Sequence, residues 1–179
     1  RTIAFKNVTK DQKEMYTRVL KGHIAVAKSK SSSREKGKKL DKLARKYLKQ
    51  VNKNFDHGTG HGVGSFLNVH EGPQVISPNG SVNFKHGMIV SNEPGYYKKN
   101  NYGIRIENLI LAKVANNILK FETITFAPLE KQLIDHKLLS REEIKWINNY
   151  HSKVRKYLLP FMSDKQSIWL KEETEKIIH

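Results

Sequence analysis

The spacing of apolar residues changes twice along this chain, and these changes limit the possible folds more than any other feature. Between residues 36 and 52, apolar side chains recur at i, i+3, i+4 and i+7 opposite a lysine-rich face, which predicts an amphipathic helix. Between residues 55 and 126 this spacing disappears, and short β-branched or apolar runs are separated by Gly, Pro and Asn, which predicts strands and turns. Helical spacing returns after residue 140. Strands gathered between helical flanks predict an α+β fold.

Capping signals locate two more helices. Thr9-Lys10-Asp11-Gln12 and Ser140-Arg141-Glu142-Glu143 each place a hydroxyl at the N-cap and Gln or Glu three residues later, followed by an apolar stripe. We expect a helix from each signal, the second ending at Pro160. Residues 2–8 are expected to form the end of a strand, and the serine-rich residues 29–33 a flexible loop.

Composition narrows the class of protein. The chain has 179 residues, 37% of them hydrophobic, which suits one domain or one domain with a small appendage. The absence of cysteine excludes a disulfide framework and any cysteine-ligated metal site. No apolar run approaches ~18 residues, and no signal-peptide pattern opens the chain. We therefore expect a soluble protein of the cytoplasm, without a membrane partner.

The strong positive charge is distributed unevenly. The net charge is +16, of which residues 1–55 carry +13, while residues 56–130 have no net charge. The basic part is rich in lysine on predicted helix faces and poor in aromatic residues, so it offers little for stacking on bases. We therefore interpret it as solvated helix surface and expect no nucleic-acid partner.

A stretch rich in glycine and histidine suggests a functional site. It runs His57-Gly58-Thr59-Gly60-His61-Gly62-Val63-Gly64 and is followed by His70-Glu71-Gly72, so three histidines and five glycines fall within sixteen residues. Glycine allows close backbone approach, and histidine binds metals and transfers protons near neutral pH. The alternative is a glycine-rich turn with incidental histidines. By contrast, His23 lies within an apolar helical stripe and is predicted to be a packed core residue.

Two glutamates are expected to face each other across a hairpin. Residues 88–92 and the strand starting at Gly103 flank a polar connection, and a hairpin centred near Asn100 places Glu93 opposite Glu107. Directly opposed Cβ atoms in an antiparallel pair are roughly 4.5–5.5 Å apart. Two negative charges at that distance require a divalent metal ion or a shared proton. The alternative is that one glutamate points into solvent at a strand end.

The surroundings of Glu107 indicate a buried and supported carboxylate. Alternation places Arg105, Leu109 and Leu111 on the same face as Glu107, and the two leucines suggest that this face is buried. Arg105 is expected either to form a structural salt bridge or to brace a metal site.

One imidazole with carboxylates suits Mn²⁺, Co²⁺ or Zn²⁺. Glutamates that can bridge suggest two such ions about 3.5–4 Å apart, which would need further carboxylates. Asp11, Glu14, Glu35 and Asp41 all fall at predicted helix starts or on polar faces, so none is expected to serve.

These motifs closely resemble the catalytic domain of aminopeptidase P, the Xaa-Pro aminopeptidases of peptidase family M24B with the pita-bread fold. The resemblance covers nearly the whole chain and is carried by residues 57–73, 91–97, 103–109, 121–123, 133–135 and 146–151. It implies an α+β pita-bread fold, incomplete here, with an antiparallel curved sheet and flanking helices. Residues 1–128 would be the C-terminal portion of that catalytic domain. Residues 129–179 would be a helical C-terminal extension that contributes to a homodimer.

The resemblance implies roles for the metal-site residues. His61, Glu93 and Glu107 would be metal ligands, with Glu107 bridging two divalent ions, Mn²⁺ first and Co²⁺ or Zn²⁺ as alternatives. Glu93 would also be catalytic, relaying the proton of a hydroxide that bridges the ions. Arg105 would support the ligands.

The implied substrate is a peptide with proline in second position, from which the first residue is removed. His57 and His70 would be catalytic residues that bind this substrate.

The chain also departs from the family pattern. The family places two further aspartate ligands just upstream, the second in an Asp-x-Thr-Arg-Thr pattern whose tail corresponds to Arg1-Thr2. We therefore expect both aspartates to precede residue 1, three of five ligands to lie within the chain, and activity to require the missing N-terminal part of the enzyme. The alternative is a catalytically inactive pita-bread remnant that acts as a binding or dimerisation module.

Overall fold

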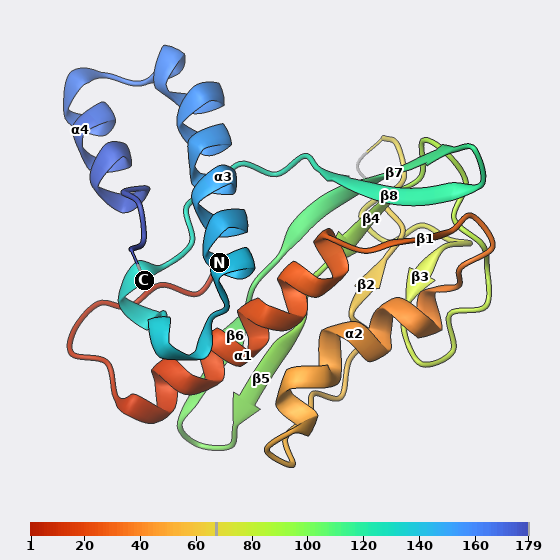
Figure 1. Cartoon of the computed structure of the whole chain (residues 1–179), viewed down its shortest axis with the longest axis horizontal. Coiled ribbons are helices and arrows are strands. Elements are labelled where there is room, and N and C mark those ends of the chain that lie inside the picture. Colours follow the sequence, from red (N-terminus) through yellow and green to blue (C-terminus); the bar gives the residue numbers. More distant parts are fainter. Residues whose placement is uncertain (67, 179) are drawn as a thin grey trace. The chain divides into compact units, whose positions relative to one another are not determined.

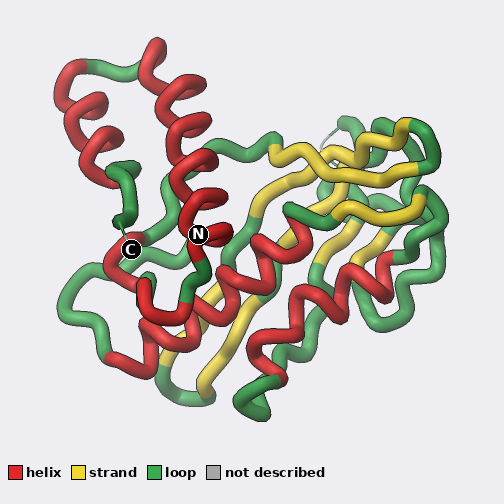
Figure 2. The backbone as a smooth tube through the Cα atoms, viewed as in Figure 1, coloured by secondary structure: helices red, strands yellow, loops and turns green. Residues whose placement is uncertain are grey.

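The computed structural model describes residues 1–66 and 68–178; Leu67 of the glycine-histidine motif and His179 of the extension lie outside the described residues. Along the chain, helices precede and follow a region of antiparallel strands, so the α+β prediction agrees with the structure (Figure 1; Figure 2). The chain divides into two compact units. One comprises residues 18–125, and the other comprises residues 1–17 together with residues 126–179.

The predicted helix starts are confirmed by their capping bonds. Thr9 and Gln12 bond each other's backbone N–H through their side chains, at 2.8 and 3.2 Å, and Ser140 and Glu143 do the same at 2.8 and 3.3 Å. Pro160 lies in the 3-10 turn that follows the third helix, as expected. No described helix combines the length and apolar character that crossing a membrane requires. The α-helices are α1 (Lys10–Ala27), α2 (Gly37–Lys49), α3 (Arg141–Leu158) and α4 (Asp164–Glu173), and the 3-10 turns are η1 (Lys131–Leu133), η2 (His136–Leu138) and η3 (Leu159–Phe161).

The strands pair antiparallel throughout. One sheet has the order β1-β8-β7-β4, and two smaller ladders pair β2 with β3 and β5 with β6. The strands are β1 (Lys30–Ser32), β2 (Gly60–His61), β3 (Val75–Ile76), β4 (Ile89–Asn92), β5 (Gly95–Lys98), β6 (Tyr102–Arg105), β7 (Asn108–Ala115) and β8 (Ile118–Thr123).

Several strand predictions were wrong. The serine-rich segment predicted as a loop contains β1, which pairs with β8, because ladder bonds use the backbone and are open to any residue with a free N–H. Residues 2–8 form no strand. The strand expected to start at Gly103 is divided into β6 and β7, with Ile106 and Glu107 between them.

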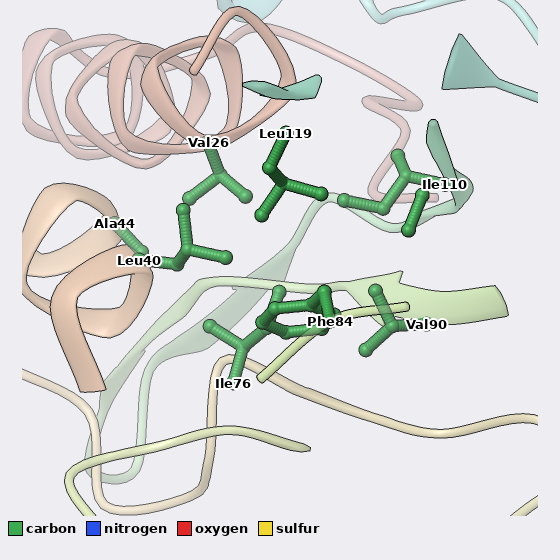
Figure 3. Packing of buried hydrophobic residues seen from close by; sticks show 9 residues of the cluster. Val26, Leu40, Ala44, Ile76, Phe84, Val90, Ile110 and Leu119 are labelled. Atoms are coloured by element: carbon green, nitrogen blue, oxygen red, sulfur yellow. The ribbon is translucent and has the colours of Figure 1, made fainter. Parts of the chain in front are cut away.

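The core of the 18–125 unit lies between its helices and one face of the four-stranded sheet (Figure 3). Gly22 of α1 allows the two helices to approach, since a Cβ there would lie 2.1 Å from the carbonyl oxygen of Ala44 in α2. The core residues are Val26, Leu40, Ala44, Ile76, Phe84, Val90, Ile110, Ala112 and Leu119.

The face of β7 that packs on this core is the opposite of the one expected. Its buried residues are Asn108, Ile110 and Ala112, whereas Leu109 and Leu111 are only half-buried. Glu107 is half-buried as well, so its face is the more open one.

The other unit is organised by α3 and α4, which run side by side in Figure 1 (blue). The side chain of Asn148 on α3 accepts from the N–H of Ile177 and donates to its carbonyl, at 2.9 and 3.0 Å. His151, also on α3, is 1% exposed and accepts a hydrogen bond from the N–H of Leu129 through Nε2 at 3.1 Å. These bonds tie α3 to the segments before and after it.

Candidate metal centre

The hairpin register brings Glu93 and Glu107 together, as the sequence predicts. Gly95 pairs with Arg105 in the β5–β6 ladder, and Asn92 pairs with Asn108 in the β4–β7 ladder. Glu93 and Glu107 therefore fall opposite each other in the gap between the two ladders. Both glutamates come from the 18–125 unit, so the unit positions them by its own strand pairing.

His61 reaches the same place from β2. Gly60 makes this possible, because a Cβ there would lie only 1.8 Å from the carbonyl oxygen of Ser91 in β4. The Ser91 hydroxyl then links the two elements: it accepts from the N–H of His61 at 2.9 Å and donates to Oε1 of Glu93 at 2.9 Å. Close backbone approach thus aligns the imidazole and the carboxylate.

The hydrogen bonding of His61 leaves Nε2 available as a ligand atom. Its Nδ1 lies 2.9 Å from the carbonyl oxygen of Gly62, which can only accept, so Nδ1 carries the hydrogen in the neutral ring. The lone pair of Nε2 then faces Oε1 of Glu93 at 3.2 Å. Two acceptors at this distance need a proton or a cation between them.

A divalent cation fits this group of side chains. Within the described residues, the ligand atoms of His61, Glu93 and Glu107 all lie within 4.8 Å of one another. Glu93 is 8% exposed, so its charge needs compensation inside the protein. One imidazole nitrogen with carboxylate oxygens matches the preferences of Mn²⁺, Co²⁺ and Zn²⁺.

Arg105 and His57 are joined through Tyr97, which the sequence interpretation missed. Nε of Arg105 donates to the Tyr97 hydroxyl at 2.8 Å, and that hydroxyl lies 3.0 Å from Nε2 of His57. Arg105 also lies 3.4 Å from Glu93, measured from Nη1 to Oε2. Strand alternation could have found Tyr97, because residues 93, 95 and 97 share a face.

These contacts favour the neutral form of His57. Burial lowers the pKa of His57, and the charge of Arg105 lowers it further, while the carbonyl of Gly58, 2.7 Å from Nδ1, acts in the opposite direction. With Nδ1–H donated to that carbonyl, Nε2 can accept from the Tyr97 hydroxyl. His57 is therefore held as one defined tautomer at the edge of the site.

The third histidine of the motif also lies at the site. His70 is exposed, and its ring centroid is 4.2 Å from that of His61. Together with the residues above it borders an open cavity of about 240 Å³. The lining residues are His57, Gly58, Gly60, His61, His70, Glu93 and Arg105. All predicted site residues except Glu107 line this cavity. Glu107 belongs to the same site because its ligand atom lies within 4.8 Å of those of His61 and Glu93.

A buried polar cluster lies next to the two glutamates in sequence. The side chain of Asn92 donates to the carbonyl of His23 at 3.0 Å, and the Asn108 amide lies 3.1 Å from Nε2 of His23. All three residues are fully buried, so the prediction of a packed core histidine is confirmed.

The interpretation of Asp41 and Arg45 was wrong. Asp41 was expected at a helix start or on a polar face, and the notion of a lysine-rich solvated face included Arg45, but the two residues are buried, 3% and 5% exposed.

The chain belongs to metallopeptidase family M24. The model of this family matches residues 1–113, and the model of the C-terminal region of M24 peptidases matches residues 117–177. The resemblance to aminopeptidase P is confirmed by relatives of that name. The chain is 43% identical to aminopeptidase P1 of Arabidopsis thaliana and 42% identical to Xaa-Pro aminopeptidase 1 of Dictyostelium discoideum, matching over 99% of its own length in both cases.

Solved structures of the same family share the fold, which confirms the pita-bread prediction. The X-prolyl aminopeptidase of Caenorhabditis elegans, described as a cytosolic enzyme with a di-nuclear active site, matches 99% of this chain with a TM-score of 0.92 and 39% identity. The prolidase of Pyrococcus horikoshii matches 74% of the chain, with a TM-score of 0.63 and 31% identity. The chain spans only about 30% of the length of the Arabidopsis, Dictyostelium and Caenorhabditis proteins.

Proposed function

We propose that this chain supplies the His-Glu-Glu half of a dinuclear metal site in an Xaa-Pro aminopeptidase, which removes the first residue of peptides with proline second. The observation that carries the proposal is the convergence of His61, Glu93 and Glu107, whose ligand atoms lie within 4.8 Å of one another. The similarity to Xaa-Pro aminopeptidases over 99% of the chain supports the choice of substrate.

His61, Glu93 and Glu107 would provide part of the ligand set for two divalent ions, Mn²⁺ first among them, which would polarise the scissile carbonyl and provide a nucleophile at neutral pH. Glu93 has the location of a proton relay: it is buried, and its Oε1 accepts from Ser91 and faces His61. In hydrolysis it would take a proton from the attacking water and deliver it to the departing nitrogen. Arg105 beside Oε2 would keep Glu93 oriented during that exchange.

The two remaining histidines would handle the peptide. His57 is held neutral by burial and by its bonds to Gly58 and Tyr97, so it would contact the peptide as an uncharged group. His70 is exposed and lines the cavity, so its ring is accessible to a peptide there. We propose that both bind the peptide and stabilise the tetrahedral intermediate.

We further propose that two aspartates from an upstream segment complete the site. Within the described residues, the group that can hold a metal contains only His61, Glu93 and Glu107. The relatives are about three times as long as this chain, which leaves room for such a segment. We also propose that residues 1–128 belong to the catalytic domain and that residues 129–179 form its C-terminal extension.

The exposed apolar residues of the last third support the proposed homodimer. Phe161, Ile168 and Trp169 are 86%, 58% and 50% exposed, and burial of such side chains against a second copy would be favourable. Light scattering during size exclusion measures the mass directly, and a monomer at micromolar concentration would refute this part. The cytosolic description of the Caenorhabditis protein supports a cytoplasmic location.

The test measures bound metal and cleavage on the protein produced from its complete coding region. We expect about two Mn²⁺ per chain and cleavage of an Xaa-Pro peptide, but not of the matched Xaa-Ala peptide. The Glu107→Ala variant should lose both metal and activity, because Glu107 would supply a carboxylate to both ions. Glu122→Ala is the matched control, since Glu122 lies exposed on β8 and pairs with Lys113 at 3.3 Å.

If the wild-type protein neither binds metal nor cleaves the peptide, the proposed aminopeptidase activity is refuted. That result would favour a binding or dimerisation module. Full metal occupancy in Glu107→Ala would refute the bridging role alone.

A further inference from the structure

A buried ion pair on α2 lies beneath the glycine-histidine loop. Asp41 and Arg45 are one helical turn apart, and Nε of Arg45 donates to Oδ2 of Asp41 at 2.8 Å. Their side chains are only 4% and 6% exposed. Burying two charges costs several kcal/mol unless further hydrogen bonds satisfy the groups, so this pair needs partners beyond each other.

Those partners lie almost entirely in the loop that leads to His57. Nη1 of Arg45 donates to the side chain of Asn54 at 2.9 Å and to the carbonyl of Phe55, and Nη2 donates to the carbonyl of His57 at 2.7 Å. The guanidinium also lies over the Phe55 ring, 3.9 Å from its centroid. One arginine thus binds three positions of the segment that ends at His57.

Asp41 continues the connection to the far side of His57. Its Oδ1 accepts from the hydroxyl of Thr59 at 2.7 Å. The carbonyl of Thr59 in turn accepts from the N–H of Glu93 at 2.7 Å. The ion pair is therefore linked through one residue to the backbone of a proposed metal ligand.

We propose that Arg45, Asp41 and Thr59 are positioning residues that set the distance between His57 and Glu93. This inference rests on the proposed metal site. The three side chains form a clamp, defined as the hydrogen bonds from Arg45 and Asp41 to residues 54–59. The planar guanidinium presents five N–H donors in a fixed fork, and the four bonds of Arg45 use donors on all three nitrogens. A lysine has one nitrogen and cannot reproduce this geometry.

The contacts of Arg45 and Asp41 distinguish a positioning role from mere stabilisation of α2. An intrahelical pair that only stabilised the helix would need no contact with the loop, yet every other bond of Arg45 and Asp41 named here goes to residues 54–59. Groups that orient metal ligands from behind change metal affinity by about 10–100-fold when they are lost. Metal affinity is therefore the measurement that reports on the clamp.

The experiment compares Mn²⁺ affinity, kcat and KM in the complete protein for four variants. Thr59→Val removes the hydroxyl at nearly constant shape, and Thr59→Ser restores it. Arg45→Lys keeps the charge but loses the fork, and its matched control is Arg34→Lys, since Arg34 is exposed. Thermal unfolding confirms that each variant is folded at the assay temperature.

We expect Thr59→Val and Arg45→Lys to weaken Mn²⁺ binding at least tenfold and to lower kcat more than they raise KM. Thr59→Ser and Arg34→Lys should stay within twofold of wild type in affinity. If Arg45→Lys fails to fold, the comparison of Thr59→Val with Thr59→Ser tests the proposal by itself.

Unchanged Mn²⁺ affinity in folded Thr59→Val, with only a lower melting temperature, would overturn the clamp and leave a structural role. Failure of the wild-type protein to bind Mn²⁺ would instead overturn the proposed function beneath it, and this result is visible before any variant is compared.

Discussion

Acidification should destabilise the unit formed by residues 1–17 and 126–179, because it protonates His151. Burial, reinforced by the charges of Arg155, Lys131 and Arg1, lowers the pKa of His151 to about 4 from 6.5. The folded ring must stay neutral because Nε2 accepts from the N–H of Leu129. Between these two pKa values the unfolded chain binds a proton that the folded chain does not, so stability falls as the pH drops below 6.5. At pH 4.5 the loss is about 2.5 kcal/mol relative to neutral pH.

Urea unfolding of wild type and His151→Gln at pH 7.5 and pH 4.5 isolates this contribution. Glutamine offers an oxygen to the N–H of Leu129 and does not titrate, and the carboxylates are the same in both proteins. The two tryptophans of the chain, Trp146 and Trp169, lie on α3 and α4, so their fluorescence follows this unit. We expect the difference in unfolding free energy to shift by about 2.5 kcal/mol in favour of the variant at pH 4.5. An equal pH dependence of the unfolding free energy in both proteins would refute the reasoning. The control is His136→Gln, which removes an exposed imidazole.

Two further predictions concern the site itself. Tyr97→Phe should raise the pKa of His57, because it removes a hydroxyl that donates to the neutral ring, and it should lower kcat/KM by roughly tenfold. A histidine NMR titration measures the pKa, and peptide kinetics measure kcat/KM. An unchanged titration would contradict the tautomer assigned to His57. Gly60→Ala should destabilise the protein by about 3 kcal/mol or more, since its Cβ would meet the carbonyl of Ser91 at 1.8 Å. Gly58→Ala is the control, with its nearest atoms at 3.5 Å, and equal melting temperatures for the two alanine variants would show that β2 can move away.

The paired glutamates could be predicted because local rules determine them. A polar connection between two strands sets the centre of the hairpin, and the centre sets every cross-strand pair. Counting from Asn100 was therefore enough to place Glu93 opposite Glu107, and the register on both sides agrees. Helix starts were predictable for the same reason, since a capping box lies within four residues.

The buried face of β7 and the clamp could not be predicted by such rules. Leu109 and Leu111 are as apolar as Ile110 and Ala112, so alternation shows two faces without showing which one the helices cover. Lysines surround Arg45 in the sequence, and only the folded loop, 9 to 12 residues further along, supplies the acceptors for its guanidinium. Charged residues are usually solvated, and the exception here depends on tertiary contacts absent from any local pattern.

The donor atoms present also determine what the three ligands can do alone. Two carboxylates and one imidazole offer at most about five donor atoms. A tetrahedral Zn²⁺ takes four ligands, and an octahedral Mn²⁺ takes six, so two such ions would need more donors than this set contains. Water can fill some positions, but it adds no negative charge to balance two divalent cations. His61, Glu93 and Glu107 could therefore contribute to one ion but offer too few donors for a pair. A second ion would need carboxylates from outside this group, which is the physical reason for proposing the two upstream aspartates.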